Sequence, residues 1–314
     1  MIYKNLYFSS LKSFYFLLIF LNVLSGTAQS RYVDEVSQEV RMRTYTYADT
    51  LQMDFYDVEI DTVSHKPTLV LMHGGGFSVG QRNGGDEKGL STYFAKRGYN
   101  VASIDYRLPL KGKSFGCTYD TSLKINVYRE AIADLSKAIH YLINYPENFK
   151  VDRHRIILMG SSAGAETLLN YVWMEQDYRF KDVPFPDAKI IGVVSISGAV
   201  LDADAIRPDT KIPALFIHGK SDPIIPYSTG AHHRCKPQDI GYLKLDGPRT
   251  IINRLKALNG VYQVFYNVNG GHEWASLGYE FPELINEFLT QSVLGRKKIQ
   301  NFKKISPPTS SKRK

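Results

Sequence analysis

Hydrophobic and polar residues follow two different patterns along this chain. Segments 43–48 and 51–60 alternate with a period of two around Asp49-Thr50, which predicts a β-hairpin. Further on, six runs of strand length follow one another, and those at 68–72, 190–197 and 214–218 fit strands that are buried on both faces. These runs lie at 68–72, 101–105, 155–159, 190–197, 214–218 and 261–268.

Segments with helical spacing separate these runs. In 127–145, apolar residues recur every three or four positions, and Pro146 ends the segment. Further helices are predicted at 86–97, 163–173, 250–258 and 280–289. Because strands alternate with helices from residue 67 onward, we expect an α/β fold. Its doubly wound, mostly parallel sheet would carry helices on both faces, with the N-terminal hairpin as an antiparallel edge.

The first thirty residues have the features of a secretion signal. An almost wholly apolar run at 14–24 follows two lysines, and small residues come next, with Gly26 and Ala28 at the spacing that a signal peptidase accepts. The apolar run is short for a membrane span. We therefore predict that residues 1–28 are a cleaved signal peptide, with an uncleaved anchor as the alternative. The mature protein would be secreted or periplasmic and have no stable membrane span.

The net charge of +8 comes from the end of the chain. Residues 295–314 hold eight Lys or Arg and no acid, and removing these eight from the 39 Lys and Arg leaves 31, equal to the 31 Asp and Glu. This balance does not indicate a nucleic-acid-binding face, so no nucleic-acid partner is expected. With Pro307-Pro308 and a Ser/Thr run, residues 295–314 are predicted to be a disordered basic tail, for which contact with a polyanion is the alternative.

No internal repeat or linker interrupts residues 29–294, so we predict one domain there. It holds two cysteines, Cys117 and Cys235. Two cysteines are too few for a disulfide scaffold or a four-ligand zinc site, and no metal is expected. The predicted location outside the cytoplasm permits a disulfide between them, but the sequence does not determine their distance.

The segment Gly160-Ser-Ser162-Ala-Gly164 fits a nucleophilic serine. A serine that attacks a carbonyl needs an exposed hydroxyl and a nearby base, and a sharp turn between a strand and a helix provides that exposure. Here the segment follows the predicted strand 155–159 and begins the predicted helix 163–173. G-x-S-x-G alone is a weak signal, and an inert serine in a glycine-rich turn is the alternative. The context makes Ser162 the candidate nucleophile.

Three consecutive glycines follow the predicted strand 68–72, in His73-Gly74-Gly75-Gly76-Phe77. Three glycines in a row cost backbone entropy, and their use is to let backbone N–H groups approach a ligand closely. We predict an oxyanion hole formed by the N–H groups of Gly75 and Gly76, with Gly74 as a further candidate, and by that of Ala163 after the nucleophile. His73 is expected to order the loop.

An acid and a histidine complete the set. Asp222 follows the predicted strand 214–218, and His272 follows two glycines after the strand 261–268. His272 would take the proton from the serine, and Asp222 would orient and stabilise the imidazole. Asp222 is chosen from its place in the chain order, and Asp202 and Asp204, one strand earlier, are the alternatives.

Three other histidines compete with His272 for the role of base. His218 lies four residues before Asp222 and is expected to be structural. His232 and His233, with Cys235 nearby, have faint metal-ligand character. Further ligands at a usual spacing are lacking, so a surface loop is the preferred interpretation.

With these motifs in the order serine, aspartate, histidine, the sequence resembles the α/β-hydrolase superfamily, and within it the esterase/lipase (carboxylesterase) group with an H-G-G-G motif. The resemblance rests on the four segments above and on Ile104-Asp-Tyr-Arg-Leu108, and it covers roughly residues 40–292. It implies an eight-stranded sheet, a serine triad and no cofactor. The Asp105-Tyr106-Arg107 run would support the oxyanion loop. The acid and histidine segments are also similar to those of secreted feruloyl and acetyl-xylan esterases.

The chain departs from that group in two places. Residues 29–66 are too short and too strand-like for a large N-terminal helical cap. The segment 223–248 is longer than a minimal turn, and together with the loop 111–121 it is expected to line the mouth of the site.

Motifs and resemblance together predict a serine hydrolase that cleaves carboxylic esters, either short-chain or linked to a polysaccharide, through an acyl-enzyme. The same triad would serve an amidase or peptidase, but peptidases of this fold usually carry a propeller or a large lid, for which 314 residues leave no room. A non-catalytic binding protein is the third interpretation, and the presence of all three triad residues disfavours it.

Overall fold

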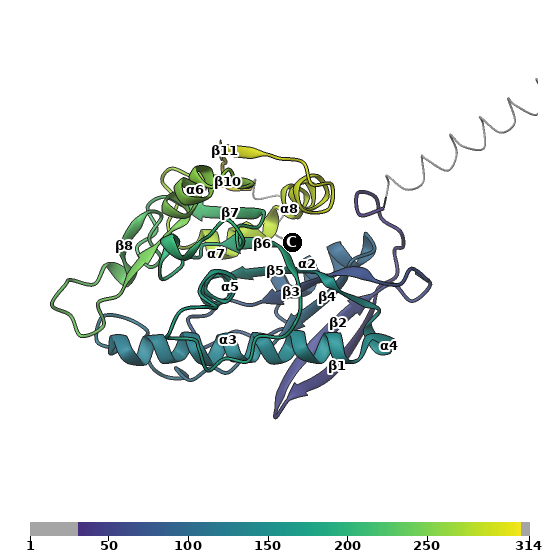
Figure 1. Ribbon diagram of the computed structural model, residues 1–314, viewed down its shortest axis with the longest axis horizontal. Helices are drawn as coiled ribbons and strands as arrows, with labels where there is room; N and C mark the ends of the chain where they lie inside the picture. Colours follow the sequence, from purple (N-terminus) through teal and green to yellow (C-terminus); the bar gives the residue numbers. More distant parts are fainter. Residues whose placement is uncertain (1–30, 309–314) are drawn as a thin grey trace, which may run out of the picture.

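Nine strands form the central sheet of the computed structural model, which describes residues 31–308 (Figure 1). Their order across the sheet is β1-β2-β4-β3-β5-β6-β7-β10-β11. The strands are β1 (Arg41–Ala48), β2 (Leu51–Asp57), β3 (Lys66–Met72), β4 (Asn100–Ile104), β5 (Val151–Ser161), β6 (Ile190–Ile196), β7 (Ala214–Gly219), β10 (Tyr262–Asn267) and β11 (Gln300–Lys304). The pairs β1–β2 and β2–β4 are antiparallel and the remaining pairs are parallel, so the predicted mostly parallel sheet with an antiparallel hairpin is confirmed.

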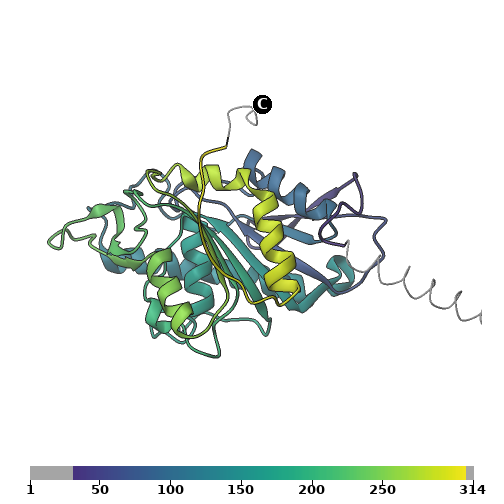
Figure 2. The ribbon, with the colours of Figure 1, turned by 90° about the horizontal axis from the view of Figure 1, so that it is seen from above.

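Helices cover both faces of this sheet, as Figures 1 and 2 show. Their bounds are α2 (Gly85–Lys96), α3 (Thr121–Asn144), α4 (Pro146–Phe149), α5 (Ala163–Trp173), α6 (Pro248–Ala257), α7 (Trp274–Leu277) and α8 (Pro282–Phe288), which continues into a π-helical turn at Leu289–Leu294. The helix α3 begins six residues before the predicted start at residue 127, because Asp120 caps its first turn by accepting a hydrogen bond from the Ser122 N–H at 2.7 Å.

The sheet divides its side chains between two hydrophobic cores. In β3, Val70 and Met72 belong to one core, together with residues of α3, α5 and α6. Leu69 and Leu71 belong to the other core, together with residues of α2, α7 and α8. Because successive side chains of a strand point to opposite faces, burial on both faces explains why the run 68–72 is apolar throughout.

The end of the chain corrects two predictions. Residues 300–304 were expected in a disordered tail, but they form β11, which pairs in parallel with β10 and makes the sheet nine-stranded instead of eight-stranded. The ring of Phe302 lies 4.5 Å from that of Tyr266, and the guanidinium of Arg249 lies over Phe302. The Asn267 side chain also donates to the Ile305 carbonyl at 2.9 Å, and the charged side chains that suggested disorder suit an exposed edge strand.

The segment between β7 and α6 contains a second, two-stranded sheet that the sequence did not predict. It pairs β8 (Thr229–Ala231) with β9 (Lys244–Asp246). A disulfide joins Cys235 in this segment to Cys117 in the loop before α3, with their Cα atoms 5.2 Å apart. The disulfide that the sequence merely permitted is therefore formed in the structure.

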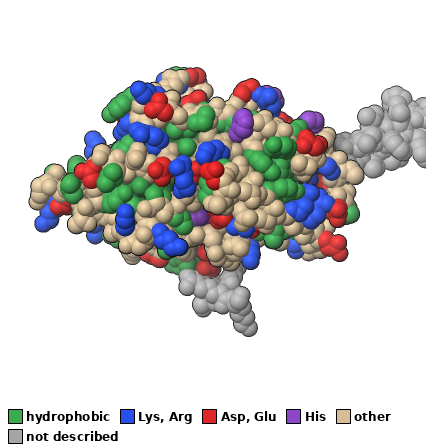
Figure 3. Space-filling view, turned by 90° about the horizontal axis from the view of Figure 1, so that it is seen from below, with side chains coloured by type: hydrophobic (Ala, Val, Ile, Leu, Met, Phe, Trp, Pro, Cys, Tyr) green, Lys and Arg blue, Asp and Glu red, His purple; other side chains and the backbone are tan. Residues whose placement is uncertain are grey.

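Two further observations concern the charges on the surface and the length of the described helices. On the face shown in Figure 3, acidic and basic side chains are interspersed. Within residues 31–308, none of the helices is long and apolar enough to cross a membrane. The predicted signal peptide, residues 1–28, lies outside the described residues.

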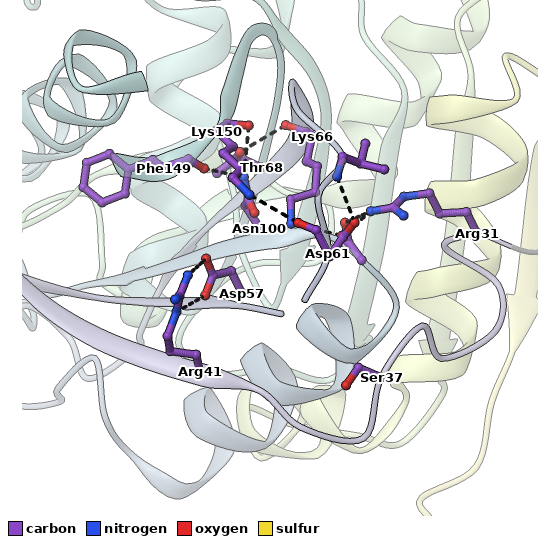
Figure 4. Close-up of polar contacts among 12 residues, drawn as sticks. Arg31, Ser37, Arg41, Asp57, Asp61, Lys66, Thr68, Asn100, Phe149 and Lys150 are labelled. Atoms are coloured by element: carbon purple, nitrogen blue, oxygen red, sulfur yellow. Dashed lines mark hydrogen bonds and ion pairs between the residues drawn. The ribbon is translucent and has the colours of Figure 1, made fainter. Parts of the chain in front are cut away.

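A buried ion pair lies at the amino end of β3 (Figure 4). The ammonium of Lys66, the first residue of β3, donates to Asp61 at 3.1 Å, and the Arg31 guanidinium donates to the same carboxylate. The Lys66 side chain is 1% exposed. Burial lowers the pKa of Lys66, while Asp61 opposes this effect. Burial alone would raise the pKa of Asp61, but the hydrogen bonds from Arg31 and Lys66 outweigh burial and lower it.

Removing the acid from this pair should cost far more than removing a surface acid. In Asp61→Asn the buried ammonium loses its counter-charge, and we expect the free energy of unfolding to fall by about 3–5 kcal/mol. Asp187→Asn, which removes the exposed partner of Arg153, should cost less than about 1 kcal/mol. Urea unfolding of both variants measures the difference, and equal losses would contradict a buried, energetically dominant pair.

Candidate active site

The carboxyl ends of the parallel strands bring the predicted site residues to one edge of the sheet. The glycine loop follows β3, Ser162 follows β5, Asp222 follows β7 and His272 follows β10. Because these strands run in the same direction, the loops that follow them meet, although they come from distant parts of the sequence.

Ser162 occupies a strained turn between β5 and α5. Its backbone has φ 47° and ψ −120°, and its N–H donates to the Ile196 carbonyl at 2.8 Å. A Cβ at position 160 would lie 2.8 Å from the Gly164 carbonyl carbon, and one at position 164 would lie 2.5 Å from the Met72 carbonyl oxygen. Both glycines are therefore required sterically, and the turn holds the serine at the edge of the sheet.

A chain of hydrogen bonds connects the three predicted side chains. The Ser162 hydroxyl oxygen lies 2.9 Å from Nε2 of His272, and Nδ1 of His272 lies 2.8 Å from Oδ2 of Asp222. The other carboxylate oxygen of Asp222 accepts the N–H groups of Ile224 and Ile225 at 2.8 and 3.0 Å. The structure therefore brings together the serine, histidine and aspartate that the sequence singled out.

Asp222 is held in its ionised form. Burial alone would raise the pKa of its carboxyl, but the hydrogen bond with His272 and the proximity of His218 outweigh burial and lower the pKa. His218 is itself fully buried, with Nε2 3.1 Å from the Ile225 carbonyl, and burial lowers its pKa to about 4. A neutral, buried His218 fits the structural role expected for it.

The alternative acids lie elsewhere. Asp202 and Asp204 are exposed, and Asp202 accepts the N–H of Asp204 at 2.9 Å at the start of a short 3-10 turn, Ala203–Ala205. This is the helix-cap role that such residues commonly have. The carboxylate that is hydrogen-bonded to His272 is that of Asp222 and not that of either alternative.

Two residues of the glycine loop have backbone conformations that favour glycine. Gly75 and Gly76 have φ values of 111° and 59°, and a Cβ at position 75 would overlap the Val79 carbonyl. Ala163 is the first residue of α5, so its N–H has no acceptor within the helix. Gly74, Gly75, Gly76 and Ser162 all line the same cavity.

Neighbouring side chains fix the loop in place. The ring of His73 stacks on that of Tyr106 with centroids 4.4 Å apart, and the Tyr106 hydroxyl donates to the His73 carbonyl at 2.9 Å. Asp105 accepts both the N–H and the guanidinium of Arg82, at 2.9 and 2.6 Å. His73, Asp105 and Tyr106 therefore support this region as expected, whereas Arg107, the third residue that the resemblance named, bonds to Asp134 of α3.

The cavity in front of Ser162 has a volume of about 600 Å³. Beyond the catalytic candidates, two sets of residues line it. One set comes from the start of α2 and its surroundings, with Asp86, Glu87 and Tyr279. The other comes from the disulfide-linked loops, with Phe115 and His233. The expectation that the segments 111–121 and 223–248 line the mouth of the site agrees with this second set.

Comparison with known proteins places these features in a family context. The BD-FAE family model matches residues 53–177, a range that contains the glycine loop and Ser162. The chain is 28% identical over 102 residues to gut esterase 1 of Caenorhabditis elegans and 27% identical over 147 residues to secreted lipase 5 of Gibberella zeae. These segments are 32% and 46% of this chain but 17% and 25% of the relatives, so the chain spans far less than two thirds of their length.

The fold has counterparts among solved structures. One is Thermogutta terrifontis esterase 2 phosphorylated by paraoxon, with a TM-score of 0.56 and 16% identity over 83% of this chain and 96% of that chain. This chain therefore has the α/β-hydrolase fold, and part of its sequence is similar to an esterase and a lipase.

A buried carboxyl that sequence reasoning missed lies in the helix that follows Ser162. Glu166 is 2% exposed, and it accepts the hydroxyl of Tyr128 at 2.9 Å. Nε2 of His232 lies 3.5 Å from the same oxygen. Burial raises the pKa of Glu166 to about 8, so the group is protonated at neutral pH. A charged residue within the apolar helix 163–173 was the signal that could have identified it.

The remaining metal hypothesis receives no support from the described residues. His232 is buried beside Glu166 and Phe115, and so is not on a surface loop as expected. Within residues 31–308, the group of side chains spaced closely enough to hold a metal is Cys117, Cys235 and Asp239, and its two sulfurs are joined in the disulfide.

The protonated state of Glu166 predicts a pH-dependent stability. The folded protein binds this proton more tightly than the unfolded chain, so the contribution of Glu166 is fully present below pH 4.5 and is lost as the pH rises to about 8. We expect Glu166→Gln, which stays neutral, to gain stability relative to the wild type by on the order of 1 kcal/mol per pH unit across this range. Urea unfolding at several pH values measures the effect.

The exposed Glu175 provides the control. Glu175→Gln should change the free energy of unfolding by the same small amount at every pH. A Glu166→Gln variant whose difference from the wild type is also independent of pH would show that Glu166 is ionised in the folded protein.

Proposed function

We propose that this protein hydrolyses carboxylic esters, with Ser162 as nucleophile, His272 as general base and acid, and Asp222 as the acid that orients the histidine. The observation that carries the proposal is the continuous hydrogen-bonded chain from the Ser162 hydroxyl through both nitrogens of His272 to Asp222. In α/β-hydrolases this arrangement converts a weak alcohol nucleophile into an effective one.

In the first half of the reaction the ester acylates the serine. Nε2 of His272 takes the proton as the Ser162 oxygen attacks the carbonyl carbon, and the ionised Asp222 stabilises the resulting imidazolium. The N–H groups of Gly75, Gly76 and Ala163, with Gly74 beside them, would hold the negative oxygen of the tetrahedral intermediate. Its collapse breaks the C–O bond, and His272 gives its proton to the departing alcohol.

In the second half, water takes the place of the alcohol. His272 removes a proton from the water, which attacks the acyl carbon of the acyl-enzyme. The second tetrahedral intermediate expels the serine oxygen, which regains a proton from His272, and the carboxylic acid leaves. The catalytic groups of this proposed cycle all come from the chain, and the cycle uses no cofactor.

Short-chain esters and acyl groups linked to a polysaccharide are the proposed substrates. The cavity of about 600 Å³ is lined by polar groups such as Gln81, Ser276 and Asp86 as well as by Phe115. Polar groups of this kind suit hydroxyl-bearing substrates better than a long alkyl chain, since an alkyl chain would leave them without partners.

Replacing the nucleophile tests the function directly. Ser162→Ala should lower kcat for p-nitrophenyl acetate by a factor of about 10⁴–10⁶. Ser161→Ala is the matched control, because the neighbouring hydroxyl donates to the Ala275 carbonyl at 2.6 Å instead of to the histidine. This control should keep kcat within about tenfold of the wild type. A wild type that is inactive on acetate through palmitate esters and on feruloylated and acetylated xylans would disprove ester hydrolysis.

The choice of acid has its own test. Asp222→Asn should lower kcat by about 10⁴-fold, because the amide favours the wrong tautomer of His272. Asp202→Asn removes an exposed carboxylate of the alternative pair and should leave kcat within about threefold. If the two variants were equally active, Asp222 would not be the catalytic acid.

We further propose that the protein is exported across a membrane, with residues 1–28 removed. The Cys117–Cys235 disulfide supports an oxidising compartment, and a secreted lipase is among the relatives. N-terminal sequencing of the mature protein is expected to begin near Gln29. An intact Met1 on protein recovered from the periplasm or medium would contradict cleavage.

A further inference from the structure

One side chain in the cavity has no place in the proposed triad or oxyanion hole. His233 lines the cavity together with Phe115 and Ile224. It belongs to the segment between β7 and α6, and its backbone lies in the left-handed region, with φ 55° and ψ 20°. The next residue, Arg234, has φ 53°. Two consecutive left-handed residues that are not glycine persist only where the surroundings hold them.

The acid loop holds His233 on one side. The His233 N–H donates to the Ile224 carbonyl at 2.7 Å, and the Ile224 N–H donates to Asp222 at 2.8 Å. The guanidinium of Arg234 donates to the Ser221 carbonyl at 3.0 Å. His233 is therefore connected to the residue that orients the catalytic histidine through two hydrogen bonds.

The disulfide holds the segment on the other side. Cys235, two residues after His233, is bonded to Cys117, whose loop also supplies Phe115 to the cavity. The Gly241 N–H donates to the Cys117 carbonyl at 2.9 Å, and the buried ammonium of Lys124 donates to the Gly241 carbonyl at 2.6 Å. The disulfide and these hydrogen bonds therefore join the two loops into one wall of the cavity, which carries Phe115, Ile224 and His233.

We propose that His233 is a specificity-determining residue of the ester-hydrolase site described above, where its imidazole contacts the uncharged substituent of the substrate that lies along the wall formed with Phe115 and Ile224. The Cys117–Cys235 disulfide holds this wall in position. The inference rests on the proposed function, since it concerns the substrate of the same site.

The chemistry of the wall defines the substituent. Burial lowers the pKa of His233 to about 4, so the ring is neutral near pH 7 and offers one N–H donor and one nitrogen acceptor. Phe115 and Ile224 add an apolar surface beside it. A wall of this kind binds a substituent larger than a methyl group by packing against its body and forming a hydrogen bond to a polar atom in it. Small acetyl esters would gain little from it.

The test uses two ester series, each with its own smallest member. One series varies the acyl group of p-nitrophenyl esters from acetate to octanoate, and the other varies the alcohol of acetates from methyl to 1-naphthyl. In His233→Asn, we expect KM for the larger members of at least one series to rise about tenfold or more, with kcat on the smallest member within about threefold of the wild type. The proposal is overturned if, in both series, His233→Asn leaves the KM values of the larger esters unchanged relative to those of the smallest.

The variant and its control are chosen to isolate the side chain. Asparagine tolerates the left-handed backbone, so His233→Asn keeps the loop conformation that alanine would strain. His154→Asn replaces an exposed histidine of β5 and should alter neither series. Urea unfolding of each variant checks the fold. A purely structural His233 would lower stability and kcat on all esters alike, without changing their ranking.

The disulfide is tested in the same assays. Cys117→Ser with Cys235→Ser should shift the ranking of the larger esters in the same direction as His233→Asn. The two changes combined should then have less effect than the product of their separate effects, because they act through one wall. A double cysteine variant that is folded and keeps the wild-type ranking would show that the disulfide does not position His233.

The proposed ester hydrolysis and the proposed role of His233 are contradicted by different results. If the wild type hydrolyses none of these esters, the proposed function is wrong. If the wild type is active and His233→Asn has the same ranking as the wild type, the function stands and the role of His233 is wrong.

Discussion

The turn at Ser162 is the constraint on which the rest of the structure depends. A non-glycine residue with φ 47° is unfavourable, and the surrounding structure compensates for it. Gly164 lets the turn pack against the end of β3, Gly160 leaves room for the start of α5, and the carbonyl of Ile196 accepts the serine N–H. These contacts require β3, β5 and β6 to lie side by side in parallel. The same contacts therefore determine both the arrangement of these three strands and the position of the Ser162 hydroxyl.

The sequence predicted the parts of the fold that local chemistry determines. Apolar runs such as 68–72 show burial on both faces without reference to any other segment, and Gly160, Gly164 and the triple glycine mark backbone conformations that few other residues can adopt. Asp222 was distinguished from Asp202 by chain order alone, since an aspartate after a strand has the same local pattern whether it caps a turn or orients a histidine. Their hydrogen bonds separate them in the structure.

Features that depend on distant contacts could not be predicted in this way. β11 was missed because its lysines dominate the local pattern, whereas its pairing with β10 depends on Phe302 reaching Tyr266. Glu166 and His232 come from segments 66 residues apart in sequence and meet only after folding. Such buried polar groups carry no periodic signal, because their environment is made by the tertiary structure and not by their neighbours in sequence.

The disulfide has a consequence for the order in which this protein is assembled. Cys117 and Cys235 are separated by 118 positions, and the covalent ring that they close contains Ser162 and Asp222 but leaves out His272. The ring can therefore close around the serine and the acid before the loop that carries His272 has docked. β10 then enters the sheet between β7 and β11, and the loop after it carries His272 to the serine. The Ser162 hydroxyl therefore gains its histidine partner only when β10 and the loop after it are in place.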